Sequence, residues 1–423
     1  MPQHVTRRDF LTLIGIGGGA TALGFPGGID PRAAASAPAH QRAVRPRSGA
    51  AGRPSAASDP ATRVLVVIEM GGGNDGLSMA PPTDDAALRA RRPGMPDAGG
   101  YLRPGNDVVL HPALTRLAER SLTIVDGVGT ASPDGSHFEM MRRWWAGDPD
   151  GTLAPETGFL GRLCDALDAG APATGVSIGS ASSPALIAAS AGTLGLPSPG
   201  WLWWLGAPAD EVGDGVVAYR DALAAMARPD RSDGSARAAA RAGLGGGLSL
   251  GDLVTGVGEL DEAPGGELGR RLALAAAVIG ADVGARVVHV PFDGGFDTHD
   301  DHWSQHEALM TELDEAVGGF LATLDDLDRS DQVVVATTSE FGRRPEENAS
   351  GGLDHGTASA ALLLGPVTRG RAGEPVDLGR LDDDDNFVAT VSMNDYYATL
   401  AAWLDVDPAA VLEGPTNPLS GIW

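Results

Sequence analysis

The sequence contains no lysine, and all 31 of its basic residues are arginine. This absence excludes mechanisms that depend on a lysine side chain, among them Schiff-base chemistry, the P-loop and Ser/Lys dyads. The single cysteine, Cys164, excludes an intrachain disulfide and a cysteine metal site. Because 56 acidic residues bring the formal net charge to −25, we expect no nucleic-acid partner.

A long apolar run is also missing, and the N-terminal region has the pattern of an export signal. Arg7 and Arg8 precede a weakly hydrophobic stretch, 11–25, whose five glycines and short length argue against a membrane-spanning helix. We predict a twin-arginine signal peptide over 1–37 and a disordered Ala/Pro/Arg linker over 38–61. An ordinary basic pair before a buried helix is the alternative. Export by this route implies the twin-arginine translocase as a transient partner, a secreted, cell-surface or periplasmic location, and no permanent membrane span.

The rest of the chain, 62–423, alternates short apolar runs with amphipathic segments and is expected to form a single domain. The run 64–70 ends at three glycines, which is typical of a strand buried on both faces. Further strands are expected at 122–128, 286–292, 332–338 and 360–364, and helices at 111–120, 138–146, 158–169, 268–282, 303–327 and 394–404. This pattern predicts an α/β fold with a central, mostly parallel sheet and helices on both faces. Residues 171–260 have weak periodicity and are expected to form peripheral insertions.

Three of the expected strands are followed by residues that bind hard cations. Asp75 follows the first strand on a glycine turn that formally contains G-x-G-x-x-G, but Pro81 and Pro82 break the helix that a dinucleotide would need. Asp297 and His299 follow the strand 286–292 and, two residues apart, point to one side of an extended segment. An Asn-Asp-Gly turn and loop acids with a capping histidine are the structural alternatives.

A third strand end and one helix start add further candidates. Glu340 and Arg343 follow the strand 332–338. The guanidinium of Arg343 could bind an oxyanion through two parallel hydrogen bonds, or it could pair with acidic residues at the surface. Ser136 precedes a helix and forms a capping box with Glu139, a role compatible with an alkoxide or phosphate at that helix start. On the long helix 303–327 and just before it, His302 and His306 lie one turn apart, as ligands or on a solvated face.

These blocks, in this order, resemble the DUF1501 family, a group of exported proteins placed in the alkaline phosphatase and sulfatase superfamily. The resemblance covers 64–404 and rests on the glycine turn with Asp75, the block 136–138 and the segments 294–299, 339–344 and 354–356. It implies an alkaline-phosphatase-like sheet, a metal-binding acid after the first strand, a nucleophile at a helix start and later Asp and His ligands.

Carried onto this chain, the resemblance puts Ser136 in the nucleophile position and implies these metal ligands: Asp75, Asp297, His299, Glu340 and His355. From the residues themselves, His137 is a candidate for proton transfer, because its unperturbed pKa of about 6.5 is near neutral. Asn74 and Arg343 are candidates for substrate binding. Phe341 replaces an expected ligand histidine, so one metal or a mixed pair is as compatible as two zinc ions. The expected cofactor is a divalent metal, zinc first, with manganese, calcium and magnesium as alternatives.

The sequence thus predicts an exported metal-dependent hydrolase of phosphate or related sulfate esters, acting on a small-molecule or cell-envelope anionic ester. Its nucleophile is Ser136 or a metal-bound hydroxide. Formylglycine chemistry is disfavoured, because the residues after Ser136 include neither the proline nor the arginine of the sulfatase motif. The alternative is a catalytically inactive exported binding or assembly protein on the same scaffold.

Overall fold

The computed structural model describes residues 59–423 except 83–85, 106, 154, 168–170, 172, 181–182, 198–208, 229–240, 242–243, 246–247 and 249–262. The expected signal peptide and nearly all of the linker lie outside the described residues. Within the described part, no helix combines the length and the hydrophobicity needed to cross a bilayer.

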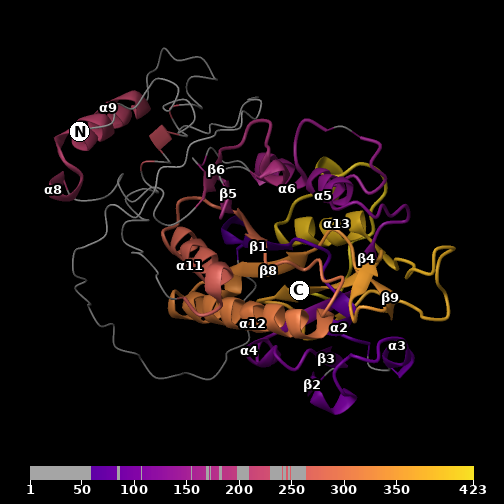
Figure 1. Ribbon diagram of the computed structural model, residues 1–423. Coiled ribbons are helices and arrows are strands. Elements are labelled where there is room, and N and C mark those ends of the chain that lie inside the picture. Colours follow the sequence, from indigo (N-terminus) through magenta and orange to yellow (C-terminus); the bar gives the residue numbers. More distant parts are fainter. Residues whose placement is uncertain are drawn as a thin grey trace.

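A central sheet organises the described part of the chain (Figure 1). Its strand order is β12-β4-β11-β8-β1-β7-β5-β6, with β13 beside β4. The strands are β1 (Val64–Met70), β4 (Leu122–Gly129), β5 (Gly175–Ile178), β6 (Thr193–Leu196), β7 (Val287–Phe292), β8 (Val333–Thr338), β11 (Ser359–Leu364), β12 (Gly370–Ala372) and β13 (Val391–Ser392). All neighbouring pairs are parallel except those of β11, which runs antiparallel between β8 and β4. The predicted α/β fold with a mostly parallel sheet is confirmed.

Two layers of helices cover this sheet. The α-helices are α2 (Gly76–Met79), α3 (Ala86–Arg91), α4 (Thr115–Ala118), α5 (His137–Ala146), α6 (Phe159–Leu167), α8 (Ala209–Val212), α9 (Asp214–Ala227), α11 (Gly266–Gly280), α12 (His302–Asp326) and α13 (Met393–Trp403). Short 3-10 helices occupy Pro60–Thr62, Ala98–Gly100, Pro184–Leu186, Ser330–Gln332 and Pro408–Ala410. Two small hairpins pair β2 (Leu102–Gly105) with β3 (Val108–Leu110) and β9 (Arg343–Glu347) with β10 (Leu353–His355).

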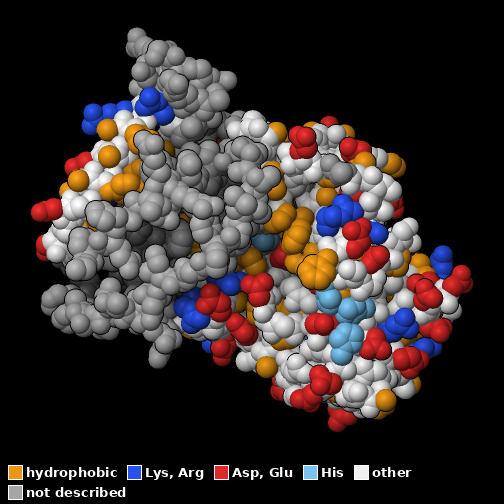
Figure 2. All heavy atoms as spheres, turned by 45° about the horizontal axis from the view of Figure 1, so that its top comes forward, with side chains coloured by type: hydrophobic (Ala, Val, Ile, Leu, Met, Phe, Trp, Pro, Cys, Tyr) orange, Lys and Arg blue, Asp and Glu red, His pale blue; other side chains and the backbone are white. Residues whose placement is uncertain are grey.

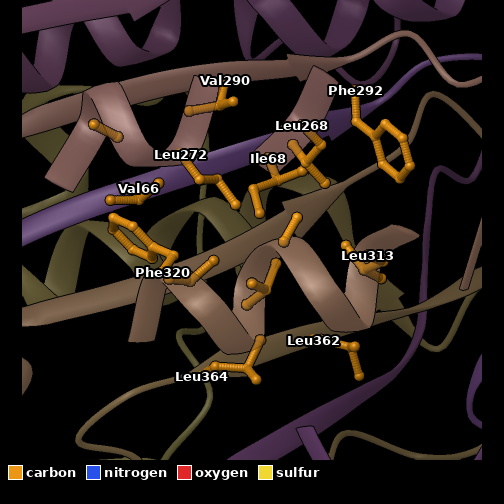
Figure 3. Close-up of a cluster of buried hydrophobic side chains, with 14 of the residues drawn as sticks. Val66, Ile68, Leu268, Leu272, Val290, Phe292, Leu313, Phe320, Leu362 and Leu364 are labelled. Carbon is orange, nitrogen blue, oxygen red and sulfur yellow. The ribbon is translucent and has the colours of Figure 1, made fainter. Parts of the chain in front are cut away.

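The alternation of side chains along β1 divides the core between the two faces. Val66 and Ile68 point to the face covered by α4, α11 and α12, whereas Leu65 and Val67 point to the face covered by α5, α6 and α13. Figure 3 shows the first core, in which side chains of α11 and α12 pack onto the strands. Each fully buried aliphatic side chain contributes about 1.5–3 kcal/mol. Both helical layers therefore hold the sheet rigidly, and helices on both faces were predicted.

The structure differs from the sequence-based expectation in two places. Residues 171–260 are not only peripheral, because β5 and β6 extend the central sheet beyond β7; such short, glycine-containing strands carry little periodicity to detect. The helix expected over 111–120 shrinks to α4. It begins at Thr115 because the carboxylate of Asp314 accepts hydrogen bonds from the backbone N–H groups of Arg116 and Leu117 at that point.

The sheet topology also decides where function can gather. Because β1, β7 and β8 are parallel neighbours, the loops after their last residues, Met70, Phe292 and Thr338, emerge at one edge. The hairpin β9–β10 follows β8 and returns across the same edge. Asp75, Asp297, His299 and Glu340 lie in these loops, Arg343 and His355 lie on the hairpin, and Ser136 lies between β4 and α5.

Candidate metal centre

Three histidines and one aspartate from distant parts of the chain meet at this edge. We call His137, Asp297, His299 and His355 the donor cluster. His137, Asp297 and His355 offer ligand atoms that all lie within 4.8 Å of one another. The Nε2 atom of His299 joins them, 3.0 Å from both Asp297 Oδ1 and His355 Nε2. Figure 2 shows histidine side chains gathered on the surface among acidic ones and beside an apolar group.

Each histidine of the donor cluster uses its Nδ1 atom to bind an oxygen that cannot donate. His137 Nδ1 lies 2.8 Å from the carboxylate of Glu340, and His299 Nδ1 lies 2.9 Å from that of Asp354. His355 Nδ1 lies 2.8 Å from the Gly135 carbonyl. Nδ1 therefore carries a proton in each ring, which makes Nε2 the nitrogen that can bind a cation. His355 Nε2 also lies 3.0 Å from Asp297 Oδ1, a hydrogen-bond distance.

The three Nε2 lone pairs face the carboxylate of Asp297 and one another. His137 Nε2 is buried, makes no hydrogen bond to any described residue and lies 3.4 Å from Asp297 Oδ2. Lone pairs at such distances repel unless a proton or a metal cation lies between them. A tetrahedral zinc ion with bonds of about 2.0–2.1 Å separates its ligands by roughly 3.3 Å, which is close to the 3.0–3.4 Å of the contacts named above; the donor atoms of His137, Asp297 and His355 as a group lie within 4.8 Å of one another. The donor set therefore fits a divalent ion of the zinc type.

Glu340 acts on the cluster from behind His137. Its Oε1 atom accepts hydrogen bonds from His137 Nδ1 and from the backbone N–H of Gly72, both at 2.8 Å. The Trp144 indole donates to its carbonyl at 2.9 Å. This buried carboxylate orients the imidazole of His137, as the carboxylate does in carboxylate–histidine–metal triads. Glu340 does not belong to the group of donor atoms, those of His137, Asp297 and His355, that lie within 4.8 Å of one another.

Arg343, expected to bind substrate, is buried and holds the loops together. Its guanidinium donates to the carbonyls of Gly72, Gly73, Phe296 and Leu353 and, at 2.9 Å, to Asp297 Oδ1. The guanidinium is thus engaged by four backbone groups and one carboxylate, so it positions Asp297 instead of presenting a fork to solvent.

The carboxylate of Asp297 is ionised throughout the neutral range. Partial burial would raise its pKa, but the hydrogen bonds from Arg343 and His355 outweigh that effect and lower the pKa to about 2. Asp354 behaves similarly, because hydrogen bonds from His299 and Asn348 lower its pKa. Both anions are available to the cluster, one directly and one through His299.

Ser136 lies next to the cluster as the N-cap residue of α5, and its side chain is exposed. The predicted capping box does not form: the hydroxyl makes no capping hydrogen bond, and Glu139 binds Arg142 and Arg143 instead, at 2.8 Å each. Charge-assisted bonds to two arginines on the same helix are stronger than a bond to one backbone N–H.

Two of the expected site residues lie apart from the donor cluster. Asp75 is 2% exposed; its carboxylate is bound by Arg92 NH1, 2.9 Å from both oxygens, and by His302 Nε2 at 3.2 Å. Asn74 is buried and donates its backbone N–H to Ser339 Oγ at 2.8 Å. His302 and His306, for which a solvated helix face was considered, are each 1% exposed, so that interpretation is wrong.

Two functional residues escaped the sequence analysis. Asp354, which binds His299, directly precedes His355, and that adjacency was the available signal. Arg92 directly follows α3. The sequence does not single it out, because it is one of several neighbouring arginines and such residues usually lie on the surface.

The fold and the donor cluster together define an α/β protein with a candidate metal centre at the carboxyl ends of its central strands. Residues 253–421 match the family model described as "Protein of unknown function (DUF1501)", which confirms the resemblance over this segment. No curated protein matches the sequence.

Several solved structures are distantly similar. The zinc complex of the C-terminal periplasmic domain of EcEptC from Escherichia coli is 10% identical, with a TM-score of 0.39, over 81% of this chain and 82% of that one. The PsFucS1 sulfatase from Pseudoalteromonas sp. is 12% identical, with a TM-score of 0.39, over 84% and 70%. A TAB5 alkaline phosphatase mutant with Mg bound is 10% identical, with a TM-score of 0.33, over 73% and 93%. Similarity at this level says nothing about the chemistry of the site.

Proposed function

We propose that this protein is an exported metal-dependent hydrolase of phosphate or related sulfate esters. One observation carries the proposal: three histidine Nε2 atoms and the Asp297 carboxylate converge at the edge of the sheet, and Ser136, the N-cap residue of α5, directly precedes one of these histidines, His137. The proposed ligands are His137, Asp297 and His355, with His299 as a fourth.

When bound there, a divalent ion supplies Lewis acidity, polarising an ester oxygen and lowering the pKa of a hydroxyl or water, worth several kcal/mol of barrier. The Ser136 hydroxyl or a water molecule would attack the phosphorus or sulfur atom and lose its proton, while the alcohol oxygen leaves and takes up a proton. If Ser136 attacks, water would then hydrolyse the serine ester and release phosphate or sulfate. The N-terminus of α5, whose N-cap side chain makes no capping bond, stabilises the anionic group through its free N–H groups. With net charge −25, the protein needs this local positive potential to attract an anion.

Phe138 gives the site an apolar rim. It follows His137 on the first turn of α5, and its side chain is 88% exposed. An aromatic ring in that place fits the organic part of an ester, whose anionic part binds at the ion. In this proposal Asp75 is not a ligand, Glu340 orients His137, and Arg343 holds Asp297.

The test compares two aspartates of the same loop. Asp297 belongs to the donor cluster, whereas Asp293 is exposed and pairs with Arg271 on the surface, 2.9 Å away. Protein loaded with zinc, manganese, calcium or magnesium is assayed against phosphomonoester, phosphodiester and sulfate ester substrates. We expect D297N to lose bound metal and turnover, and D293N to keep both.

A second variant tests the nucleophile. S136A loses turnover but keeps its metal if the serine attacks, and keeps turnover if water does. Wild-type protein that binds metal but hydrolyses none of these esters would favour the binding or assembly protein, and D297N with full metal content would refute the proposed ligand set.

A further inference from the structure

A buried chain of side chains leads away from the donor cluster into the protein. We call Thr298, His302, Asp75 and Arg92 the buried relay. The relay begins between two members of the donor cluster, since Thr298 separates Asp297 from His299. Each of its residues is at most 2% exposed.

The relay is continuous. Thr298 Oγ lies 2.6 Å from His302 Nδ1, and His302 Nε2 lies 3.2 Å from Asp75 Oδ2. Arg92 NH1 then lies 2.9 Å from both oxygens of Asp75. Three different elements contribute: the loop after β7 with the start of α12, the glycine turn after β1, and the residue that follows α3.

Hydrogen bonds hold the side chains of the relay in place. Because Arg92 neutralises Asp75, this buried pair carries no net charge. His302 Nε2 faces the Asp75 carboxylate, and its Nδ1 faces the Thr298 hydroxyl, which also donates to the Phe296 carbonyl at 3.4 Å. The Thr298 side chain is thus held between the loop after β7 and the start of α12.

Arg92 also ties the relay to the second half of the metal centre. Its NH2 group donates to the Arg344 carbonyl at 2.7 Å, and its Nε donates to the Pro345 carbonyl at 3.1 Å, both on β9. β9 pairs with β10, which carries His355, and the Leu353 N–H of β10 donates to the Thr298 carbonyl at 3.1 Å. The relay is therefore in contact with two of the three segments that supply ligands, the loop after β7 and the hairpin β9–β10.

We propose that the buried relay is a positioning device that sets the spacing of Asp297 and His299, and so the affinity of the centre for its divalent ion. The inference rests on the proposed metal centre, but not on ester hydrolysis. A buried ion pair is weak evidence for stability by itself. The Arg92–Asp75 pair, however, is linked through His302 to Thr298, which lies between two proposed ligands. Side chains in such a position orient the residues that bind the metal.

The experiment removes one hydroxyl from the full chain. T298V retains the branched shape of threonine without the hydroxyl, T298A removes the side chain beyond Cβ, and T298S keeps the hydroxyl. The matched control is T123V, because Thr123 is also buried and its hydroxyl donates to a backbone carbonyl, that of Thr368, away from the site. The readouts are zinc affinity, by competition with a chromophoric chelator, and the melting temperature of metal-free protein.

We expect T298V and T298A to bind zinc about 10–100-fold more weakly than wild type, and T298S to recover most of the affinity. T123V is expected to lower the melting temperature while leaving zinc affinity unchanged, which separates positioning from general stability. Zinc affinity of T298V and T298A equal to that of wild type overturns the inference and leaves the proposed function standing. Zinc binding that depends on Thr298 without turnover of any ester supports the inference and defeats the hydrolase. A wild-type protein that binds no zinc, manganese, calcium or magnesium overturns both.

Discussion

Two adjacent arginines, Arg91 and Arg92, offer a direct measurement of what burial does to an ion pair in this protein. Arg92 pairs with Asp75 at 2.9 Å, and both side chains are at most 1% exposed. Arg91 pairs with Glu346 at 2.7 Å, with side-chain exposures of 33% and 58%. Distance and charge are nearly equal, so the two pairs differ in solvent access and in the further hydrogen bonds that Arg92 and Asp75 make to the backbone of β9 and to His302.

The structure gives the expected magnitudes. At an effective dielectric constant of about 20, opposite charges 2.9 Å apart attract by roughly 6 kcal/mol, whereas in water a pair at 2.7 Å attracts by roughly 1.5 kcal/mol. Desolvation offsets much of the larger attraction, but removing one partner leaves the other charge buried and unpaired. We therefore expect D75N and R92M each to lower the free energy of unfolding by about 3–5 kcal/mol, with a coupling energy of about 2–3 kcal/mol in the double variant.

The assay is urea unfolding of metal-free protein at neutral pH for wild type, both single variants and the double variant. The same cycle with R91M and E346Q is the control, with an expected coupling of at most about 1 kcal/mol. Equal coupling energies in the two cycles, or a loss below about 1 kcal/mol for R92M, would refute the reasoning that burial decides the strength of the pair.

Three further predictions concern the donor cluster. The pKa of Asp297 is lowered to about 2 in the folded protein, against about 3.9 when unfolded. The ionised carboxylate therefore stabilises the fold fully above pH 4, and this stabilisation is lost as the pH falls toward 2. In urea titrations, the free energy of unfolding of D297N should depend less on acid pH than that of wild type. Chelation should lower the melting temperature of wild type, since ion at 100 times its Kd stabilises by about 2.7 kcal/mol, whereas H355A should melt alike with and without chelator. F138A should raise KM for aryl phosphates without changing metal content or stability, because the ring is 88% exposed; I187A, at a side chain 47% exposed elsewhere, is the control, and equal effects of the two would contradict an apolar rim.

Much of the fold could be predicted from local patterns. The apolar run that forms β1 and the parallel direction of most strands follow from hydrophobicity and from the alternation of strands and helices. The outer strands β5 and β6 could not be predicted, because short strands with glycine and small residues carry little periodicity. The strand that forms β11 was expected but its antiparallel direction was not, because strand direction depends on the path of the connecting chain and not on the strand's own residues.

The sequence predicted which residues belong to the candidate site better than it predicted how they are arranged. Asp297, His299 and His355 were expected as ligands and do lie together. Asp75 carried an equally strong sequence signal, a carboxylate after the first strand, yet it faces Arg92 and His302. A carboxylate ligates a metal or pairs with a guanidinium equally well, and the choice depends on which partner the fold brings to it.

By itself, the amino-acid sequence determined the alternation of buried strands and helices, the acidic character of the protein and the types of donor atom available at the strand ends. These follow from local hydrophobic pattern and composition, which do not depend on contacts between distant residues. Only the tertiary structure decided which nitrogen of each histidine is free, that Glu340 and Arg343 orient their neighbours, and that Thr298 leads to a buried ion pair. Those properties depend on hydrogen bonds between residues as many as 271 positions apart, such as the one between Arg343 and Gly72, and a local sequence pattern does not contain them.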